Sequence, residues 1–454
     1  MTAVRYHPSI THLMKRFGTV GGNHVGVTHG FAVSMSDLPG EPWMPTMTAK
    51  MPHYERIVFD NPSMEMQYHL SGYGLTNEEA FVRLMGESVE RYAAMVAMPG
   101  FAGELRRASF ADLARGERVM PLDLLALYDW DQQRRMAALM HQYSPDHPTT
   151  DTELTWVRMA SLVRPGEDVW LPAQLVFLGF KAGPGEGEML YSPSFSTGTA
   201  AHVSTMRALR SALIEAIQID AFIVNWYTDT PGRRVVVDDA GVEAHLERLR
   251  VGPSSNYRHL AVELTLPDLP LPVLGVFLER RDEKIPFITF GVQGDPDPVH
   301  AMIRGTMESA AITGLGIYSS LFDTGIVHKA VNDSRYLDLD TNVLFFASPV
   351  DAEEKRGAVR QRISGEVALS GLKRTAGGTV EDEVQWLVEM VRGVSEYAGY
   401  LDITPPELAD TDWKVLRVVI PELCSMCLPG MPPLRHPRLL RHGGVTNEMP
   451  HPLP

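Results

Sequence analysis

The stretch Ser71-Gly-Tyr-Gly-Leu-Thr-Asn-Glu-Glu-Ala-Phe-Val-Arg-Leu-Met-Gly-Glu-Ser-Val-Glu-Arg-Tyr92 decides how this chain folds. It predicts a glycine turn that leads into a helix, because Thr76 is a good N-cap and Glu79, three residues later, completes a capping box. Apolar residues at helical spacing form one face of this helix: Phe81, Leu84, Met85 and Val89. The stretch therefore predicts an amphipathic helix held close to a tight turn.

A second face of the same helix is charged. Glu87 and Glu90 lie about one turn apart, with Arg83 and Arg91 close by. Such a face can be a solvated surface, with ion pairs worth about 0.2–0.5 kcal/mol each. It can also hold a divalent cation or a polyphosphate–metal complex, because Mg²⁺ prefers hard oxygen ligands. The choice between these interpretations depends on two further helices.

The second helix is predicted from Ser204 to about Trp226. Most of its positions are apolar, and its polar residues form one narrow stripe: Arg207, Ser211, Glu215 and Gln218. Buried polar groups need partners, so the stripe lines either a wet cleft or an internal hydrogen-bond network.

The third helix is predicted to start at Asp297-Pro298, which suit the N-cap and first helical positions. His300, Arg304 and Glu308 then share one face. The alternative for Arg304 and Glu308 is a local ion pair, although the Arg-before-Glu order is the weaker orientation.

The remaining pattern predicts an α+β fold, because helices and mostly antiparallel strands alternate without a regular βαβ rhythm. A charged run over 351–362 and a loop ending at Gly377-Gly378 are expected to form a mobile or inserted segment. A loop at 183–187 is expected to close a hairpin. Further helices are expected at 9–16, 121–140 and 379–392, and strands at 64–70, 154–162, 169–180, 235–237, 260–266, 274–278, 287–292, 342–347 and 413–420.

Composition excludes several classes of protein. The chain has 454 residues, of which 44% are hydrophobic and 21% charged, as in ordinary globular proteins. A formal charge of −15 argues against nucleic acid bound through its phosphates. No apolar run approaches the roughly 18–20 residues of a membrane span, and the start has no signal-peptide pattern, so a cytoplasmic protein is expected. There is no P-loop motif, so any ATP is bound without one.

Two features near the end of the chain have competing interpretations. Cys424 and Cys427 form a C-x-x-C pair with no second pair of ligands, which favours reduced, partly buried thiols over a redox pair or a site shared at an interface. The last five residues, Pro450-His451-Pro452-Leu453-Pro454, predict an extended, stiff tail close to polyproline II. A disordered tail is the alternative.

Taken together, the three helices resemble those of YcaO-type ATP-dependent enzymes. The resemblance runs from about residue 65 to the end of the chain and rests on an ordered set of motifs. The terminal P-x-P-x-P resembles the subgroup that forms azolines on ribosomally made peptides, the cyclodehydratases typified by the D-protein of thiazole/oxazole-modified microcins. The matching stretches are Gly72-Tyr-Gly74, Glu87-Ser-Val-Glu90-Arg91-Tyr92, Glu215-Ala-Ile-Gln218-Ile-Asp220-Ala221, Gly291 to Pro298, and Arg304-Gly-Thr-Met-Glu308.

The resemblance implies a catalytic domain over residues 61–430, between an N-terminal segment (1–60) and a proline-rich tail (431–454). It implies ATP and Mg²⁺ as cofactors. Many relatives read E-x-x-E-R-D in the second helix, whereas this chain has Gln218 and Ile219, so a ligand role for Gln218 stays open. The implied magnesium ligands are Glu87, Glu90, Glu215 and Glu308, and the implied nucleotide contacts are these four with Gln218 and Arg304.

The implied reaction is cyclodehydration. A Cys, Ser or Thr side chain of a precursor peptide adds to the preceding amide carbonyl, the oxyanion is phosphorylated from ATP, and loss of phosphate gives a thiazoline or oxazoline. The implied catalytic residues in the tail are Pro450, Pro452 and Pro454, with the Pro454 carboxylate directed at the substrate amide. Residues appended after Pro454 are then expected to impair cyclisation more than folding.

The resemblance also implies partners. They are a leader-bearing precursor peptide, a leader-binding protein of the E1-like or ThiF-like type, an FMN dehydrogenase acting next, and a second copy of this chain in a homodimer. The leader-binding protein is expected to be separate, because about 60 residues before the catalytic region are too few for such a domain. The alternatives are thioamide or amidine formation, and a non-catalytic peptide-binding scaffold, for which Gln218 and Ile219 are the only support.

Overall fold

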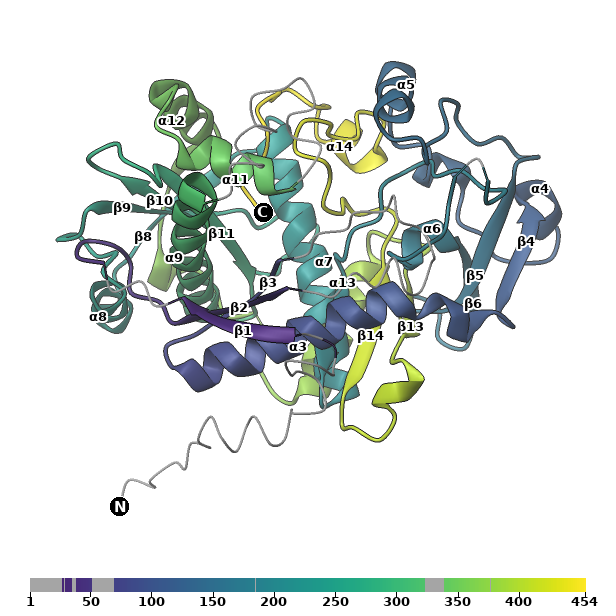
Figure 1. Ribbon diagram of the computed structural model, residues 1–454, viewed down its shortest axis with the longest axis horizontal. Coiled ribbons are helices and arrows are strands. Elements are labelled where there is room, and N and C mark those ends of the chain that lie inside the picture. Colours follow the sequence, from purple (N-terminus) through teal and green to yellow (C-terminus); the bar gives the residue numbers. More distant parts are fainter. Residues whose placement is uncertain are drawn as a thin grey trace.

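The computed structural model describes residues 27, 29–34, 38–50, 69–183, 185–322, 339–375 and 377–454. Its strands form three sheets, and helices lie between and outside them (Figure 1). Almost all strand pairs are antiparallel, and the helices do not alternate regularly with them. The predicted α+β class is confirmed.

The smallest sheet has the order β1-β2-β3 and is antiparallel, with strands β1 (His29–Ser34), β2 (Thr46–Lys50) and β3 (His69–Tyr73). Helix α3 (Asn77–Val96) packs against β3 and β2. The Thr76 side chain caps α3 by accepting the Glu79 N–H at 3.2 Å, as predicted. The Glu79 carboxylate accepts the Leu75 N–H at 2.8 Å, one residue before the cap residue that a capping box would use.

The second sheet has five strands in the order β11-β10-β9-β8-β12, and only the β12–β8 pair is parallel. Helix α9 (Pro298–Phe322) covers β10 and β11, and helices α8 (Ala240–Arg248) and α11 (Leu339–Ala347) pack against α9. Helix α12 (Ala352–Gln361) packs against β12. The strands are β8 (Gly232–Val236), β9 (Tyr257–Glu263), β10 (Val273–Arg280), β11 (Ile288–Gly294) and β12 (Ile363–Ala368).

The third sheet has the order β4-β5-β13-β14-β7, with β6 also paired to β5. Its strands are β4 (Leu105–Ser109), β5 (Glu153–Ser161), β6 (Asp168–Pro172), β7 (Thr199–His202), β13 (Gly399–Asp402) and β14 (Lys414–Val419). The shorter helices of this half of the molecule are α4 (Phe110–Leu113), α5 (Trp130–Leu139), α6 (Ala173–Val176) and α14 (Pro437–Arg441).

Helix α7 (Thr205–Tyr227) joins the two larger sheets. It packs against β7 and β14 on one side and against β11 on the other, and α13 (Val380–Arg392) lies beside it. Figure 1 shows α7 passing steeply through the middle of the molecule. Buried on several sides, the helix is apolar nearly all round, which explains why its polar stripe is so narrow.

Several predicted elements are wrong. Residues 342–347 belong to helix α11 rather than to a strand, because a short continuous apolar run does not distinguish a buried strand from a buried helix. The strand expected over 169–180 ends at Pro172, where α6 begins. The helix expected over 121–140 is a 3₁₀ turn at Leu122–Leu124 followed by α5.

The segment expected to be mobile or inserted also differs. Residues 352–361 form α12, and the next strand, β12, is an integral member of the five-stranded sheet. The helix expected at 9–16 and residues 64–68 of an expected strand lie outside the described residues. Among the described helices, none has both the length and the apolar character needed to cross a bilayer.

Candidate functional site

Three strands, β3, β7 and β11, each lead through a turn into the helix that packs against them: α3, α7 and α9 respectively. Two of these contacts require glycine. A Cβ on Gly72 would lie 2.0 Å from the Ala80 carbonyl oxygen, and a Cβ on Gly291 would lie 2.4 Å from the Gly305 carbonyl oxygen. The helix backbones therefore lie directly on their strands.

On each of the three helices, one glutamate side chain binds the backbone of the strand that precedes the helix, or of the residue just before that strand. In every case one carboxylate oxygen, Oε2, accepts a backbone N–H. The Glu87 carboxylate accepts the Ser71 N–H at 3.0 Å. The Glu215 carboxylate accepts the Gly198 N–H at 3.1 Å, and the Glu308 carboxylate accepts the Val292 N–H at 2.7 Å. The same local motif thus holds three of the sequence-predicted site residues.

The carboxylates are close enough to influence one another. Burial raises the pKa of Glu215 to about 7, against the lowering effect of Arg91. Burial also raises the pKa of Glu308 to about 7, and the charges of Glu215 and Glu87 add to this rise. Burial raises the pKa of Glu87, and raises that of Glu90 well above its ordinary value. The structure therefore brings four predicted acidic residues into one desolvated region.

Two arginines partly offset this negative charge. The Arg91 guanidinium lies 3.0 Å from the Glu90 carboxylate and 3.7 Å from that of Glu87. Arg417 on β14 is only 3% exposed and donates to the Thr197 carbonyl oxygen at 2.7 Å. Both arginines lower the pKa values of the nearby carboxylates, less strongly than burial raises them.

Arg304 on α9 lies over the ring of Tyr73, with its guanidinium carbon 5.1 Å from the ring centroid. Arg83 lies 5.5 Å from the centroid of the same ring and is ion-paired with Glu79. The Nη1 atom of each arginine is buried and has no hydrogen-bond partner among the described residues, but Arg83 is also ion-paired with Glu79 through its Nη2. A buried guanidinium N–H without an acceptor is unfavourable, so this position suits an anionic ligand.

Gln218, the residue whose role was open, is used within the protein. Its side-chain oxygen accepts the Gly294 N–H at 2.7 Å and the Gln293 Nε2–H at 3.3 Å. Both donors belong to β11, so Gln218 ties α7 to the strand that precedes α9. Its side-chain oxygen therefore already has two partners.

His300 lies in the first turn of α9 on the same helix face as Arg304 and Glu308. Its Nδ1 is 2.9 Å from the Asp295 carboxylate, which raises the His300 pKa through their hydrogen bond. Asp295 also lies 3.3 Å from Arg210 of α7. These contacts extend the polar region from Glu308 towards the N-terminus of α9.

The donor set fits Mg²⁺ shared with a phosphate ligand. Among the described residues, no three acidic, His or Cys side chains form a metal cage built from protein alone. Magnesium usually keeps waters and is bound through one or two carboxylates plus substrate phosphates. Glu215 and Glu308 each accept a backbone N–H through one carboxylate oxygen, Oε2.

The sequence reasoning missed Tyr73, Asp295 and Arg417 as members of this region. Arg417 had a detectable signal, because it is a charged residue with apolar residues on both sides, in the run Val415-Leu-Arg-Val-Val419 of β14. Tyr73 lies between the two glycines of the opening motif, and nothing in their spacing indicates that its ring meets Arg83 and Arg304. Nothing in the sequence indicates that Asp295 faces His300 and Arg210.

The residues of the tail lie along helix α7 in an antiparallel sense. The backbone N–H of Thr446 donates to the Tyr227 carbonyl oxygen at 2.8 Å, and the Trp226 indole N–H donates to the Met449 carbonyl oxygen at 3.0 Å. The ring of His451 then lies 5.8 Å from that of Phe222. The tail is therefore docked, as the stiff-tail prediction requires, and Pro450 and Pro452 are buried.

A buried ion pair secures the chain ahead of the tail. Arg438 of α14 donates Nε and Nη2 to the Asp220 carboxylate of α7 at 3.0 and 2.8 Å, and it also pairs with Asp268. Asp220 is 0% and Arg438 1% exposed. Asp220 further accepts the Cys424 N–H at 2.8 Å, so one carboxylate connects α7 to both C-terminal segments.

The two cysteines are buried and form no disulfide in this structure. Burial raises the pKa of Cys427 to about 12 and that of Cys424 well above its ordinary value. Neither thiol is therefore ionised near neutral pH. Cys424 borders a cavity of about 90 Å³ that is also lined by Arg417, Thr197 and Ala216, the neighbour of Glu215.

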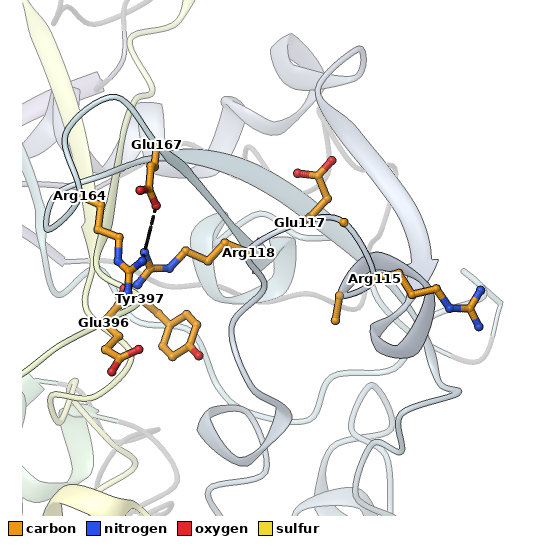
Figure 2. Close-up of a pocket in the computed structure, with 9 residues that line it drawn as sticks. Arg115, Glu117, Arg118, Arg164, Glu167, Glu396 and Tyr397 are labelled. Carbon is orange, nitrogen blue, oxygen red and sulfur yellow. Dashed lines mark hydrogen bonds and ion pairs between the residues drawn. The ribbon is translucent and has the colours of Figure 1, made fainter.

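A larger hollow, of about 460 Å³, lies elsewhere and is lined by residues 114–118, Arg164, Glu167, Glu396 and Tyr397. Figure 2 shows the guanidinium groups of Arg118 and Arg164 beside the Glu167 carboxylate, which lies 3.3 Å from Arg118. It includes none of the predicted site residues, and its arginines already have acidic partners.

The arrangement can now be compared with known proteins. The family described as YcaO cyclodehydratase, ATP- and Mg²⁺-binding, matches residues 71–424. That span is most of the chain and contains the three site helices α3, α7 and α9. The chain belongs to the YcaO family, and ATP and Mg²⁺ are the cofactors of that family. No curated protein matches this chain in sequence.

Solved structures share the fold. A heterocyclase in complex with substrate and cofactor matches with a TM-score of 0.70 at 15% identity over 99% of this chain, which spans 59% of that protein's length. YcaO from Methanopyrus kandleri, bound with AMPPCP and Mg²⁺, matches with a TM-score of 0.60 at 18% identity, covering 98% of this chain and 95% of that one. The E. coli microcin synthetase McbBCD complex with pro-MccB17 bound matches with a TM-score of 0.53 at 14% identity, covering 87% and 88%.

Proposed function

We propose that this chain is an ATP- and Mg²⁺-dependent peptide cyclodehydratase that converts Cys, Ser or Thr residues of a ribosomally made precursor peptide into thiazolines or oxazolines. The observation that carries the proposal is the set of carboxylates on three strand–helix units, together with Arg304, whose buried Nη1 has no hydrogen-bond partner among the described residues. This is the donor set that a metal-bound polyphosphate requires.

Each predicted residue receives a role in this proposal. Arg304 binds phosphate oxygens through its unpaired guanidinium N–H, and Gln218 borders the nucleotide through its amide nitrogen, because its oxygen is already bonded. Bound magnesium would neutralise phosphate charge and orient the phosphoryl group for transfer. The proposed magnesium ligands are Glu87, Glu90, Glu215 and Glu308.

The chemistry balances without a nucleophile from the protein. The hydroxyl or thiol of the substrate residue forms a bond to the preceding amide carbon, and the resulting oxyanion takes the γ-phosphoryl group of ATP. Elimination of phosphate then carries the former amide oxygen away and leaves the C=N bond of the azoline, with ADP as the second product. The protein contributes positioning and charge stabilisation.

The tail segment Pro450–Pro454 is proposed to line the substrate side of the site. His451 packs against Phe222, and the three residue steps from His451 to Pro454 span about 9–10 Å in an extended or polyproline II conformation. The seven residue steps of α7 from Phe222 back to Glu215 correspond to a rise of about 10 Å. Because the tail runs antiparallel to α7, these lengths support an end near Gln218 and Glu215.

The partners in this proposal are a leader-bearing precursor peptide and a separate leader-binding protein of the E1-like or ThiF-like type. An FMN dehydrogenase would oxidise the azolines, and two copies of this chain would form a homodimer. The structural match to a synthetase complex that has its pro-peptide bound supports a peptide substrate and partner proteins. The cavity beside Arg417 offers space for a substrate side chain.

The test is Mg²⁺-dependent phosphate release on a leader-bearing Cys/Ser/Thr peptide, with the candidate partner present and the peptide followed by mass spectrometry. The proposal requires loss of one water per ring, coupled to phosphate release and abolished by Glu215→Gln. Glu243→Gln, at an exposed position of α8, is the matched control and should leave turnover unchanged. ATP turnover with a different mass change would indicate thioamide or amidine formation, and absence of nucleotide binding would indicate a scaffold.

A further inference from the structure

Asn342, on helix α11, is a buried residue with no role in the proposed nucleotide site. It is 0% exposed, and its Nδ2 donates to the carbonyl oxygens of His451 at 2.7 Å and Leu453 at 2.6 Å. One side-chain amide thus holds two backbone carbonyls of the tail, from a helix more than a hundred residues earlier in the chain.

The chemistry of the tail explains why an amide suits this position. Pro450, Pro452 and Pro454 have no backbone N–H, so the carbonyl groups are the main hydrogen-bonding groups that the tail offers. Carbonyls of alternate residues point to the same side of an extended chain. An Asn side chain supplies two N–H donors from a single atom, which matches two such carbonyls.

The orientation of the Asn342 amide is fixed by these contacts. Reversing it would place Oδ1 against two carbonyl oxygens, so the assignment does not depend on the usual ambiguity between the amide oxygen and nitrogen. In the present orientation Oδ1 is buried and has no partner among the described residues. A polar atom left without a partner is unfavourable, so the amide is best explained by its two donor contacts.

The side chain of His451 restrains the same part of the tail from another direction. Its Nε2 lies 3.0 Å from the Cys427 carbonyl oxygen, and its ring meets those of Phe222 and Tyr227 edge-on, with centroids 5.8 and 6.2 Å away. Backbone and side chain are therefore both held at this residue. Beyond Leu453, the described structure shows no further hydrogen bond to the tail.

We propose that Asn342 is a positioning residue, which fixes the backbone at His451 and Leu453 so that the end of the tail is aimed at the substrate peptide. The inference rests on the proposed function, because it requires the tail to act in ring formation. Loss of the two hydrogen bonds from Asn342 to the tail should then leave nucleotide binding unchanged. It should lower the number of rings formed per phosphoryl transfer.

The test uses Asn342→Ala and Asn342→Leu in the full chain, with two separate measurements. The first is hydrogen exchange of the peptide that covers residues 445–454. It reports directly on how firmly Asn342 holds the tail and does not require enzymatic activity. Faster exchange in both variants is expected. Unchanged exchange would mean that Asn342 does not hold the tail, and would overturn the inference whatever the enzyme does.

The second measurement is the number of rings formed per phosphate released. We expect kcat for ring formation to fall by about ten- to a hundredfold, the scale of a misplacement of about 1 Å, with KM for ATP unchanged. Faster hydrogen exchange of the tail, together with an unchanged rate of ring formation, would overturn the positioning role. Absence of rings with the unaltered chain as well would instead refute the proposed function, and the inference with it.

Two controls separate positioning from loss of structure. Asn225→Ala removes another buried Asn whose Nδ2 donates to a backbone carbonyl, that of Thr230 at 2.9 Å, and it should not change the ratio of rings to phosphate. In a chain that lacks residues 450–454, Asn342→Ala should cause no further loss. An additional loss in that chain would show that Asn342 acts by another route and would overturn the inference.

Discussion

Asp220 and Arg438 are 218 positions apart in the chain, yet the two nitrogen atoms Nε and Nη2 of the arginine donate to the same carboxylate at 3.0 and 2.8 Å. Neither side chain reaches water. The pair joins the central helix α7 to α14, the last helix before the tail. It therefore couples the stability of the molecule to the placement of its C-terminal segment.

Replacing Asp220 with Ala should destabilise the protein strongly, because it leaves the Arg438 guanidinium buried without its main partner. We expect a loss of about 3–5 kcal/mol in the free energy of unfolding, measured by chemical denaturation. Arg158→Ala, which breaks the half-exposed pair with Asp168, is the control and should cost at most about 1 kcal/mol. Equal losses for the two variants would contradict the structural role of Asp220.

Replacing Arg304 with Ala should weaken ATP binding, because it removes a partly buried guanidinium whose Nη1 has no hydrogen-bond partner among the described residues. Charge-assisted hydrogen bonds contribute about 1.5–3 kcal/mol, so a loss of at least about tenfold in affinity is expected by calorimetry. Arg83→Ala is the comparison, since Arg83 lies over the same Tyr73 ring and has a buried Nη1 without a partner too, but its charge is already paired with Glu79. A larger effect at Arg83 than at Arg304 would argue against the assigned role.

The affinity for Mg²⁺ and ATP should rise with pH up to and just above 7. Burial raises the pKa values of Glu215 and Glu308 to about 7 in the folded chain without ligand, so both carboxylates hold protons below that pH. Metal binding must displace those protons, and titrations near pH 6 should show proton release that is absent near pH 8.5. Glu308→Gln should reduce the number of protons released, and a pH-independent affinity would contradict this assignment.

The same pKa values have an opposite consequence for the ligand-free protein. A pKa raised in the folded state means that folding favours the protonated carboxyl group. Stability from Glu215 and Glu308 is therefore fully present below the ordinary pKa near 4.5 and is lost as pH rises through about 7. Denaturation midpoints of the ligand-free chain should show this decline, and Glu215→Gln should flatten it.

Replacing Gly291 with Ala should disrupt the contact between β11 and α9. The added Cβ would lie 2.4 Å from the Gly305 carbonyl oxygen and 2.6 Å from the Ser309 amide nitrogen, and neither backbone atom can move freely. We expect a loss of about 3 kcal/mol or more in the free energy of unfolding. Gly116→Ala, where a Cβ would meet nothing within 4 Å, is the control and should have little effect.

The three site helices could be predicted from sequence because each has a strong local signal. Thr76, Ser204 and Asp297-Pro298 mark the helix starts within one residue, and helical spacing identifies the shared polar faces. Capping residues and periodicity depend on neighbours in the chain, which a single sequence reveals. The acidic residues of the candidate site were accessible for the same reason.

What could not be predicted depends on contacts between distant segments. The apolar run in α11 suits a strand equally well, and only its packing against α9 decides for a helix. Arg417 joins the site because β14 lies beside β7, and Asn342 meets the tail across more than a hundred residues. The oxygen of Gln218 is bonded to β11, a partner that the motif on α7 does not indicate.

The carboxylates of Glu87, Glu215 and Glu308 each bind a backbone N–H only 16 or 17 residues away. Contacts of such short range require little loop closure and can form early in folding. Each helix can thus orient its own acidic group before the three units meet. We therefore expect the site to assemble by docking of three strand–helix units, which would bring the carboxylates together only late in folding.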